Sequence, residues 1–109
     1  MLFVRLSLMR AKAGQENDVA EIEDDLVAFY RGCQGFVAGY KLKAADEVGD
    51  IGRVTVWRSG EDADAAAQTQ HVLSRRSELI PLVVEGTDAE RSFYAVEGES
   101  LAGLLAKLG

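Results

Sequence analysis

The segment Gly35–Trp57 constrains the fold more than any other part of the chain, because it predicts two strands joined by a tight turn. Residues 36–43 alternate between apolar and polar side chains, and residues 44–50 are rich in the Asp and Gly that favour turns. Residues 51–57 are rich in β-branched side chains and end at the only tryptophan. One strand–helix pair precedes this hairpin and one helix–strand pair follows it. The order predicts an α+β, ferredoxin-like βαββαβ fold with a four-stranded antiparallel sheet.

The remaining elements follow from the spacing of apolar residues. Alternation over Leu2–Met9 predicts the first strand, and helical spacing over residues 15–33 predicts a helix. Ser59 begins a capping box, which predicts a second helix that runs without a break to about Leu79. The last strand is predicted at Arg91–Val96.

Both faces of the predicted sheet carry apolar side chains. On the first strand, one face is aliphatic and the other is mixed: Leu2, Val4, Leu6 and Leu8 against Phe3, Arg5, Ser7 and Met9. On the second strand, alternation predicts one shared face for Phe36, Ala38, Tyr40 and Leu42. Right-handed crossovers place both helices on one face of the sheet. We therefore expect a second copy of the chain to cover the other face, as a homodimer through the sheet.

The chain is predicted to hold one domain over residues 1–98 and a helical tail over residues 99–109. In the tail, leucines fall on one face of a short helix: Leu101, Leu104, Leu105 and Leu108. A helix this short is marginal alone in water, so we expect it to dock on another surface.

Composition limits the classes of partner. The net charge is −6, without a basic stripe, which disfavours nucleic acid and anionic membranes as partners. No run of apolar residues is long enough for a membrane span, and the N-terminal segment lacks the pattern of a signal peptide. The single cysteine fits a reducing compartment. We expect a cytoplasmic protein.

Three residues are candidates for a catalytic role, and each also has an ordinary structural explanation. Trp57 is either a large apolar anchor or the wall of a pocket for an aromatic substrate. His71, the only histidine, is either a partly exposed helix residue or a general base for a phenolic proton. Arg53 lies near the middle of a strand, where an arginine either faces solvent, pairs with an acid, or stabilises an enolate in a cavity.

Four further residues are candidates for binding a flat aromatic ligand between the helices and the sheet. Ala67 belongs to a group of small residues that either pack closely on the sheet or leave space for a ligand. Tyr30, Tyr40 and Tyr94 can offer hydroxyl groups to such a ligand, or place them at the rim of the core.

The sequence offers no usual site for a metal or a cofactor. With one His and one Cys, only a carboxylate cluster could bind a metal, and the acidic run Glu21–Asp25 is interpreted as a solvated helix face. No glycine-rich turn between a strand and a helix is present to bind a dinucleotide. We therefore expect no cofactor and no metal.

The pattern from Gly35 to the second helix resembles the antibiotic biosynthesis monooxygenase-like domains. The resemblance rests on G-F-x-x-G-Y, an acidic turn, a strand that ends in Trp, and then Ser with an acidic helix start: Gly35, Phe36, Gly39, Tyr40, Trp57, Ser59, Glu61 and the later His71. It covers residues 2–96 and implies a dimeric α+β barrel. The family includes cofactor-independent oxygenases of aromatic polyketides, quinol oxygenases and haem-degrading enzymes.

The resemblance implies a cofactor-independent monooxygenase that acts on a small aromatic, quinol or polyketide-like substrate. The alternative is a non-catalytic, dimeric protein that binds a small ligand or has a regulatory role. The chain departs from the family at several positions: Ala65 stands where members often have a histidine, and Arg53 lies where polyketide oxygenases have an asparagine. Arg76 lies near the position of the haem-ligand histidine of the haem-degrading members, which disfavours haem.

Overall fold

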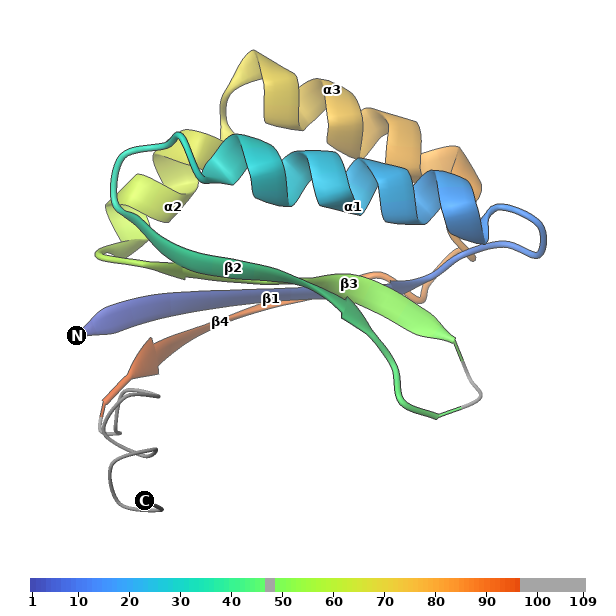
Figure 1. Ribbon diagram of the computed structural model, residues 1–109, viewed down its shortest axis with the longest axis horizontal. Coiled ribbons are helices and arrows are strands. Elements are labelled where there is room, and N and C mark those ends of the chain that lie inside the picture. Colours follow the sequence, from blue (N-terminus) through green and yellow to red (C-terminus); the bar gives the residue numbers. More distant parts are fainter. Residues whose placement is uncertain (47–48, 97–109) are drawn as a thin grey trace, which may run out of the picture.

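The fold is a four-stranded antiparallel sheet with every described helix on one side of it (Figure 1). The computed structural model describes residues 1–46 and 49–96. The strand order is β2-β3-β1-β4, which confirms the predicted ferredoxin-like α+β arrangement. The elements are β1 (Leu2–Arg10), α1 (Glu16–Tyr30), β2 (Phe36–Lys43), β3 (Asp50–Trp57), α2 (Gly60–Ala67), α3 (Gln70–Leu79), the 3-10 turn η1 (Ile80–Leu82) and β4 (Ala89–Ala95).

The prediction of one unbroken second helix is wrong, because this segment forms two helices, α2 and α3. The Ser59 hydroxyl caps α2 by accepting a hydrogen bond from the Asp62 amide at 3.1 Å. At the break, the Thr69 hydroxyl donates to the Ala66 carbonyl at 2.8 Å and caps α3 as an acceptor. Because α3 begins separately at Gln70, the residues of this segment that face the core differ from those of one continuous helix. Val72 is buried, whereas its neighbour Leu73 is 42% exposed.

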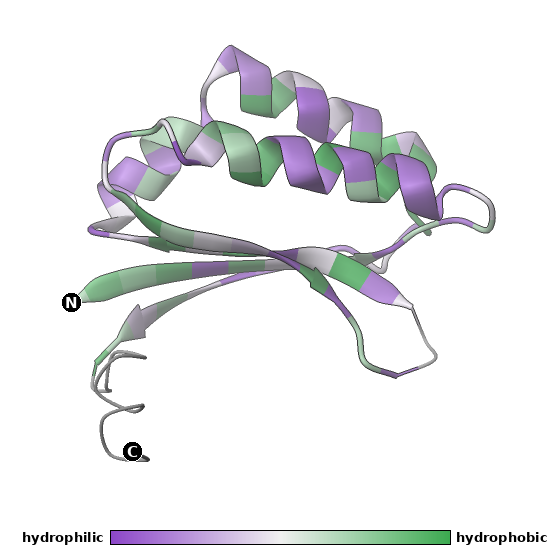
Figure 2. Cartoon of the chain, in the orientation of Figure 1, coloured by the Kyte–Doolittle hydropathy of each residue, from purple (hydrophilic) through white to green (hydrophobic). Residues whose placement is uncertain are grey.

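The two faces of the sheet differ in their surroundings. Phe3, Ser7 and Met9 of β1 are buried beneath the helices. The alternate residues of β1 lie on the other face, which no described helix covers, and they are exposed or half-buried: Leu2, Val4, Leu6 and Leu8. Hydrophobic colour runs along much of β1 in Figure 2, although one side of this strand lies outside the helix layer. The uncovered face is therefore apolar.

The prediction of a shared face for alternate residues of β2 fails at its first residue. The register of β2 with β3 shifts between Phe36 and Ala38, as in a β-bulge. Phe36 packs edge-on against Trp57, with 5.6 Å between the ring centroids, whereas Tyr40 lies opposite Val54 on the uncovered face. The bulge separates the two aromatic residues because it adds one residue to the alternation.

The core lies between the helices and the sheet. Its largest fully buried side chains include Trp57, Leu26 and Val19, and one charged residue, Glu23. Tyr30 packs edge-on against Trp57 with 5.5 Å between the ring centroids. The predicted tail helix lies outside the described residues. Among the described helices, none is both long and apolar enough to cross a membrane.

Candidate functional site

Two hollows that share four lining residues lie on the helix side of the sheet. The inner pocket has an apolar wall formed by Trp57, Ala63 and Ala67. Its polar groups come from both strands and helices: Arg5, Ser7, Tyr30, Arg53, Thr55, Arg76 and Glu90. The cavity in the inner pocket is about 10 Å³, roughly the space of one water-sized sphere.

The second hollow, the α3 groove, is much larger, at about 700 Å³. Helix α3, η1, residues 83–88 and strands β1 and β4 form its walls. Most of its apolar side chains lie around the end of α3: Leu73, Leu79, Ile80, Pro81, Val83 and Val84. This volume falls in the usual range for small-molecule sites.

A buried ion pair stands at the junction of the two hollows. Arg53 of β3 donates from Nη1 to both carboxylate oxygens of Glu23 on α1, at 2.8 and 2.9 Å. Both side chains are almost completely buried. Burial is the largest single influence and by itself lowers the pKa of Arg53, but the charge and hydrogen bonds of Glu23, together with Tyr30 and Glu90, raise it, and the net direction is upward. Arg53 therefore stays cationic at this position.

Tyr30 and Trp57 present two aromatic rings and a hydroxyl group to the inner pocket. Burial raises the pKa of Tyr30, although the nearby charge of Arg53 acts in the opposite direction. The Tyr30 phenol therefore remains neutral and can donate a hydrogen bond at neutral pH. The indole Nε1 of Trp57 donates to the Thr55 hydroxyl at 2.9 Å, which fixes the ring against the sheet.

Glu90 supplies a carboxylate to both hollows from β4. The Ser7 hydroxyl donates to its Oε2 at 3.2 Å. The guanidinium groups of Arg5 and Arg76 lie 3.9 and 3.6 Å from its oxygens. The Glu90 side chain is 37% exposed, so it stands where the site meets solvent. A partly exposed carboxylate beside a cavity can accept a proton from a bound ligand.

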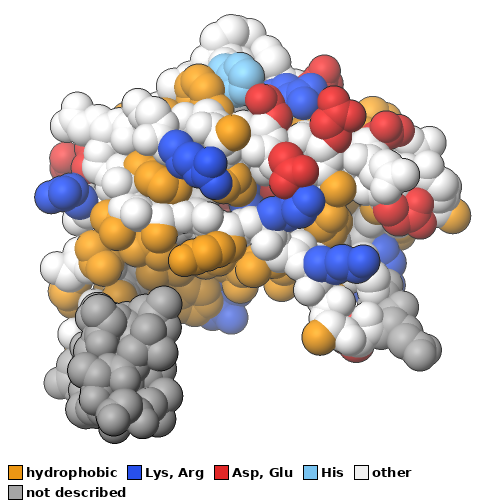
Figure 3. Space-filling model, in the orientation of Figure 1, with side chains coloured by type: hydrophobic (Ala, Val, Ile, Leu, Met, Phe, Trp, Pro, Cys, Tyr) orange, Lys and Arg blue, Asp and Glu red, His pale blue; other side chains and the backbone are white. Residues whose placement is uncertain are grey.

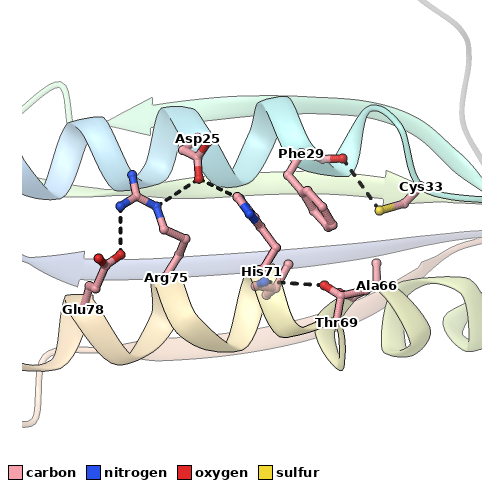
Figure 4. Close-up of polar contacts among 9 residues, drawn as sticks. Asp25, Phe29, Cys33, Ala66, Thr69, His71, Arg75 and Glu78 are labelled. Carbon is pink, nitrogen blue, oxygen red and sulfur yellow. Dashed lines mark hydrogen bonds and ion pairs between the residues drawn. The ribbon is translucent and has the colours of Figure 1, made fainter.

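His71 lines neither hollow and lies between α3 and α1. Its Nε2 is 2.8 Å from Oδ2 of Asp25, which also accepts from Nε of Arg75 at 2.9 Å. Its ring is stacked on Phe29, with 4.4 Å between the ring centroids. Figure 4 shows His71 and Arg75 pointing from α3 toward Asp25. This placement gives no support to a general base at His71, which remains an untested prediction.

Charged side chains surround the histidine on the surface. In the view of Figure 3 they gather around it over the helices, whereas hydrophobic side chains gather lower, at the level of the sheet. The His71–Asp25 contact thus belongs to a solvent-facing network that joins α3 to α1.

The structure brings together Arg53, Trp57, Tyr30 and Ala67 of the predicted site residues, all at the inner pocket. Tyr40 does not join them, because it is 63% exposed on the uncovered face of the sheet. Tyr94 lies at the end of β4, where its ring packs edge-on against Phe3 with 5.6 Å between the centroids.

The sequence interpretation missed several polar residues of the site, among them Ser7, Arg76 and Glu90, and also the partner of Arg53. Glu23 is fully buried, so the interpretation of the run Glu21–Asp25 as a solvated face is wrong at its middle position. The helical stripe contained the signal, because Glu23 lies four residues after Val19 and three before Leu26. Ser7 and Glu90 carried no local signal, since only sheet pairing places them opposite each other. Arg76 was noted only for its position in the resemblance.

Within residues 1–46 and 49–96, no group of three or more His, Cys, Asp or Glu residues is arranged to bind a metal ion. The Nε2 atom of His71 already contacts Asp25, so a haem iron would have to displace that contact.

No family model and no curated protein sequence matches the chain. Solved structures do match it. Rv0793 from Mycobacterium tuberculosis superposes with a TM-score of 0.82 at 14% identity, over 92% of this chain and 100% of that one. SnoaB, a cofactor-independent oxygenase from Streptomyces nogalater, gives a TM-score of 0.76 at 18% identity, over 89% of this chain and 95% of that one.

A third neighbour is named "putative antibiotic biosynthesis monooxygenase" and comes from Nitrosomonas europaea. It gives a TM-score of 0.80 at 15% identity, over 91% of this chain and 94% of that one. At identities this low, the likeness shows a shared fold and leaves the chemistry to the residues of the site. The chain therefore has the fold of the antibiotic biosynthesis monooxygenase-like proteins.

Proposed function

We propose that this protein is a cofactor-independent monooxygenase that acts on a small, electron-rich aromatic substrate such as a quinol or a polyketide-like anthrone. One observation carries the proposal: an aromatic wall, a neutral phenol, a fixed guanidinium and a carboxylate surround one pocket, which shares four lining residues with a groove of about 700 Å³. The fold shared with SnoaB, a cofactor-independent oxygenase, supports this choice.

The residues of the pocket can perform the proton transfer that such a reaction needs. Glu90 would accept a proton from the substrate, and Arg53 and Tyr30 would stabilise the oxyanion that results. The substrate anion would give an electron to O₂, and the radical pair would combine as a peroxide. The peroxide anion would take back the proton held by Glu90 and become a hydroperoxide. On a substrate carbon that began as CH₂, as in an anthrone, the hydroperoxide R₂CH–OOH then loses water and leaves a carbonyl group, with one oxygen atom retained and the other in the water.

The test is oxygen uptake with an anthrone and a hydroquinone as substrates. The wild-type protein should consume oxygen faster than the buffer does. Tyr30→Phe and Glu90→Gln should each lower the rate by about 10²-fold or more, the usual effect of losing one acid–base group. Glu21→Gln, which changes an exposed acid of α1, should leave the rate unchanged. Uptake equal to that of buffer for both substrates would exclude the oxygenase.

A second candidate is a non-catalytic protein that binds a small ligand in the same place. The inner cavity of about 10 Å³ favours this candidate. An aromatic ligand in the α3 groove could not bring its ring into the inner pocket without movement of the surrounding side chains. Saturable binding of an anthraquinone product analogue without oxygen uptake would support this candidate.

We also propose that the chain forms a homodimer through the uncovered face of the sheet. The face is apolar along β1 and carries exposed large side chains on the neighbouring strands, including Tyr40 and Phe93. An apolar face of this kind is typical of an interface between identical subunits.

A further inference from the structure

We propose that the inner pocket and the α3 groove form one binding site, that Arg53 binds an anionic oxygen of the ligand at its inner end, and that Glu23 is the positioning residue that holds Arg53 there. The aromatic nature of the ligand rests on the proposed function. The positioning role of Glu23 and the negative charge of the ligand rest on the geometry of the site.

The two hollows belong together because they share residues. Ser7, Arg53, Arg76 and Glu90 line both of them. A ligand that enters along the α3 groove therefore reaches these four side chains first and the apolar wall at Trp57 beyond them. The groove is large enough for a ring system, whereas the inner pocket accepts only a small group. An amphiphilic molecule with an aromatic body and a compact polar head fits this division.

Glu23 occupies one nitrogen of the Arg53 guanidinium, and Tyr30, which also lines the inner pocket, hydrogen-bonds to the same guanidinium. A paired arginine commonly uses two nitrogens, one for each carboxylate oxygen. Here both hydrogen bonds leave from Nη1, so Glu23 engages neither Nε nor Nη2. Arg53 is 5% exposed and lines both hollows, so its position is fixed by packing and by Glu23.

The charges at the junction favour an anionic head on the ligand. Arg53 and Arg76 face the shared region, and Arg5 lines the inner pocket. Glu90 is the opposing carboxylate, and it already has Arg5 and Arg76 within 4 Å. A phenolate or carboxylate that approaches Arg53 would therefore meet fixed donors in a site largely closed to water.

The experiment compares two ligands that share one ring system and differ in the charge of the head: 2-naphthoate and 2-naphthamide. Quenching of the fluorescence of Trp57, the only tryptophan and a wall of the inner pocket, reports binding. The wild-type protein should bind naphthoate about tenfold more tightly than naphthamide, which is the usual scale of one charge-assisted hydrogen bond.

The variants separate positioning from charge. Arg53→Lys keeps the positive charge and the pair with Glu23 but has only one nitrogen, so the preference for naphthoate should disappear. Glu23→Gln keeps an acceptor for Nη1 and should retain the preference, whereas Glu23→Met should lose it. Glu21→Gln on the exposed side of α1 is the matched control and should behave as the wild type.

The inference is overturned by equal affinities for the two ligands in the wild type, or by a preference that survives in Arg53→Lys. A folded Glu23→Met protein that keeps the preference would reduce Glu23 to a structural role. If this variant does not fold, Arg53→Lys and Glu23→Gln decide. The binding test involves no turnover, so its result is independent of the oxygenase test. A preference for naphthoate without oxygen uptake would support this inference and exclude the oxygenase. Oxygen uptake without a preference for naphthoate would support the oxygenase and overturn this inference.

Discussion

Glu23 and Arg53 show how one buried pair controls both the stability and the chemistry of this protein. Each charge would be costly to bury alone, and the two make hydrogen bonds of 2.8 and 2.9 Å in a nearly closed interior. The pair joins α1 to the middle of β3 directly beneath the inner pocket. A change at either residue therefore acts on the core and on the site together.

We predict that Arg53→Met lowers the free energy of unfolding by about 3–5 kcal/mol, because it leaves the Glu23 carboxylate buried without a partner. The double variant Glu23→Met/Arg53→Met should recover most of this loss, since apolar side chains of similar size replace the whole pair. Urea denaturation followed by Trp57 fluorescence measures both values. A loss below about 1 kcal/mol in the single variant would show that the carboxylate finds water or another donor.

The second prediction concerns Tyr30 and the stability of the fold at alkaline pH. Burial raises the pKa of Tyr30 in the fold, whereas in the unfolded chain the phenol ionises near ~10. Proton release therefore favours the unfolded chain once the pH passes ~10, and the fold loses stability from there up to the raised pKa.

Tyr30→Phe should remove this part of the alkaline loss, so its stability should fall less steeply above pH ~10 than that of the wild type. Denaturation at a series of alkaline pH values measures the slopes, and phenolate absorbance follows the ionisation. Parallel slopes for the two proteins would contradict the prediction. Tyr40→Phe, at an exposed tyrosine, is the matched control.

At the scale of elements, the break between α2 and α3 decides which side chains reach the site. The Thr69 hydroxyl holds both helix ends, since it donates to Ala66 of α2 and caps the first turn of α3. In this orientation of α3, Arg76 lines both hollows, whereas His71 contacts Asp25 of α1. The position of this cap therefore decides which side chain of α3 lines the hollows.

We predict that Thr69→Ala lowers the free energy of unfolding by about 1 kcal/mol through loss of the cap. It should also weaken binding of 2-naphthoate, because α3 carries one wall of the groove. Ser77→Ala, within the exposed part of the same helix, should change stability by less than ~0.5 kcal/mol. Thermal unfolding compares the two variants, and equal effects would argue against the cap.

At the scale of the whole molecule, the sheet has one face in the core and one face without a cover among the described elements. The described helices all lie on the site side of the sheet, so the apolar residues of the other face need a different neighbour. A second copy of the chain would cover them with an equivalent surface.

We predict a dimer of about twice 11.8 kDa, and a monomer after Leu6→Glu, because the new charge would lie in the centre of the apolar face opposite Val54. Ile80→Glu, at an exposed residue of η1, should remain dimeric. Light scattering after size exclusion gives the masses. A wild-type monomer at micromolar concentration would refute the interface.

Alternation and turn residues were enough to predict the order of the elements. The strand at residues 36–43 and the hairpin that follows it are confirmed, because turn chemistry and period-two spacing act locally. The bulge after Phe36 and the break at Thr69 were not predicted. Both depend on tertiary contacts. At the bulge, Phe36 packs inward against Trp57. At the break, α2 ends where the Thr69 hydroxyl donates a hydrogen bond to the Ala66 carbonyl.

The sequence by itself determined the α+β fold and the apolar character of both sheet faces. Of its seven candidate site residues, four line one pocket in the structure: Arg53, Trp57, Tyr30 and Ala67. Only the tertiary structure decided what surrounds them. Glu23 is separated from Arg53 by 30 residues in sequence, and Glu90 from Ser7 by 83. Contacts between such distant residues come from sheet order and helix packing, which local periodicity does not encode, and for this reason the partners of the site's carboxylates emerged only from the folded chain.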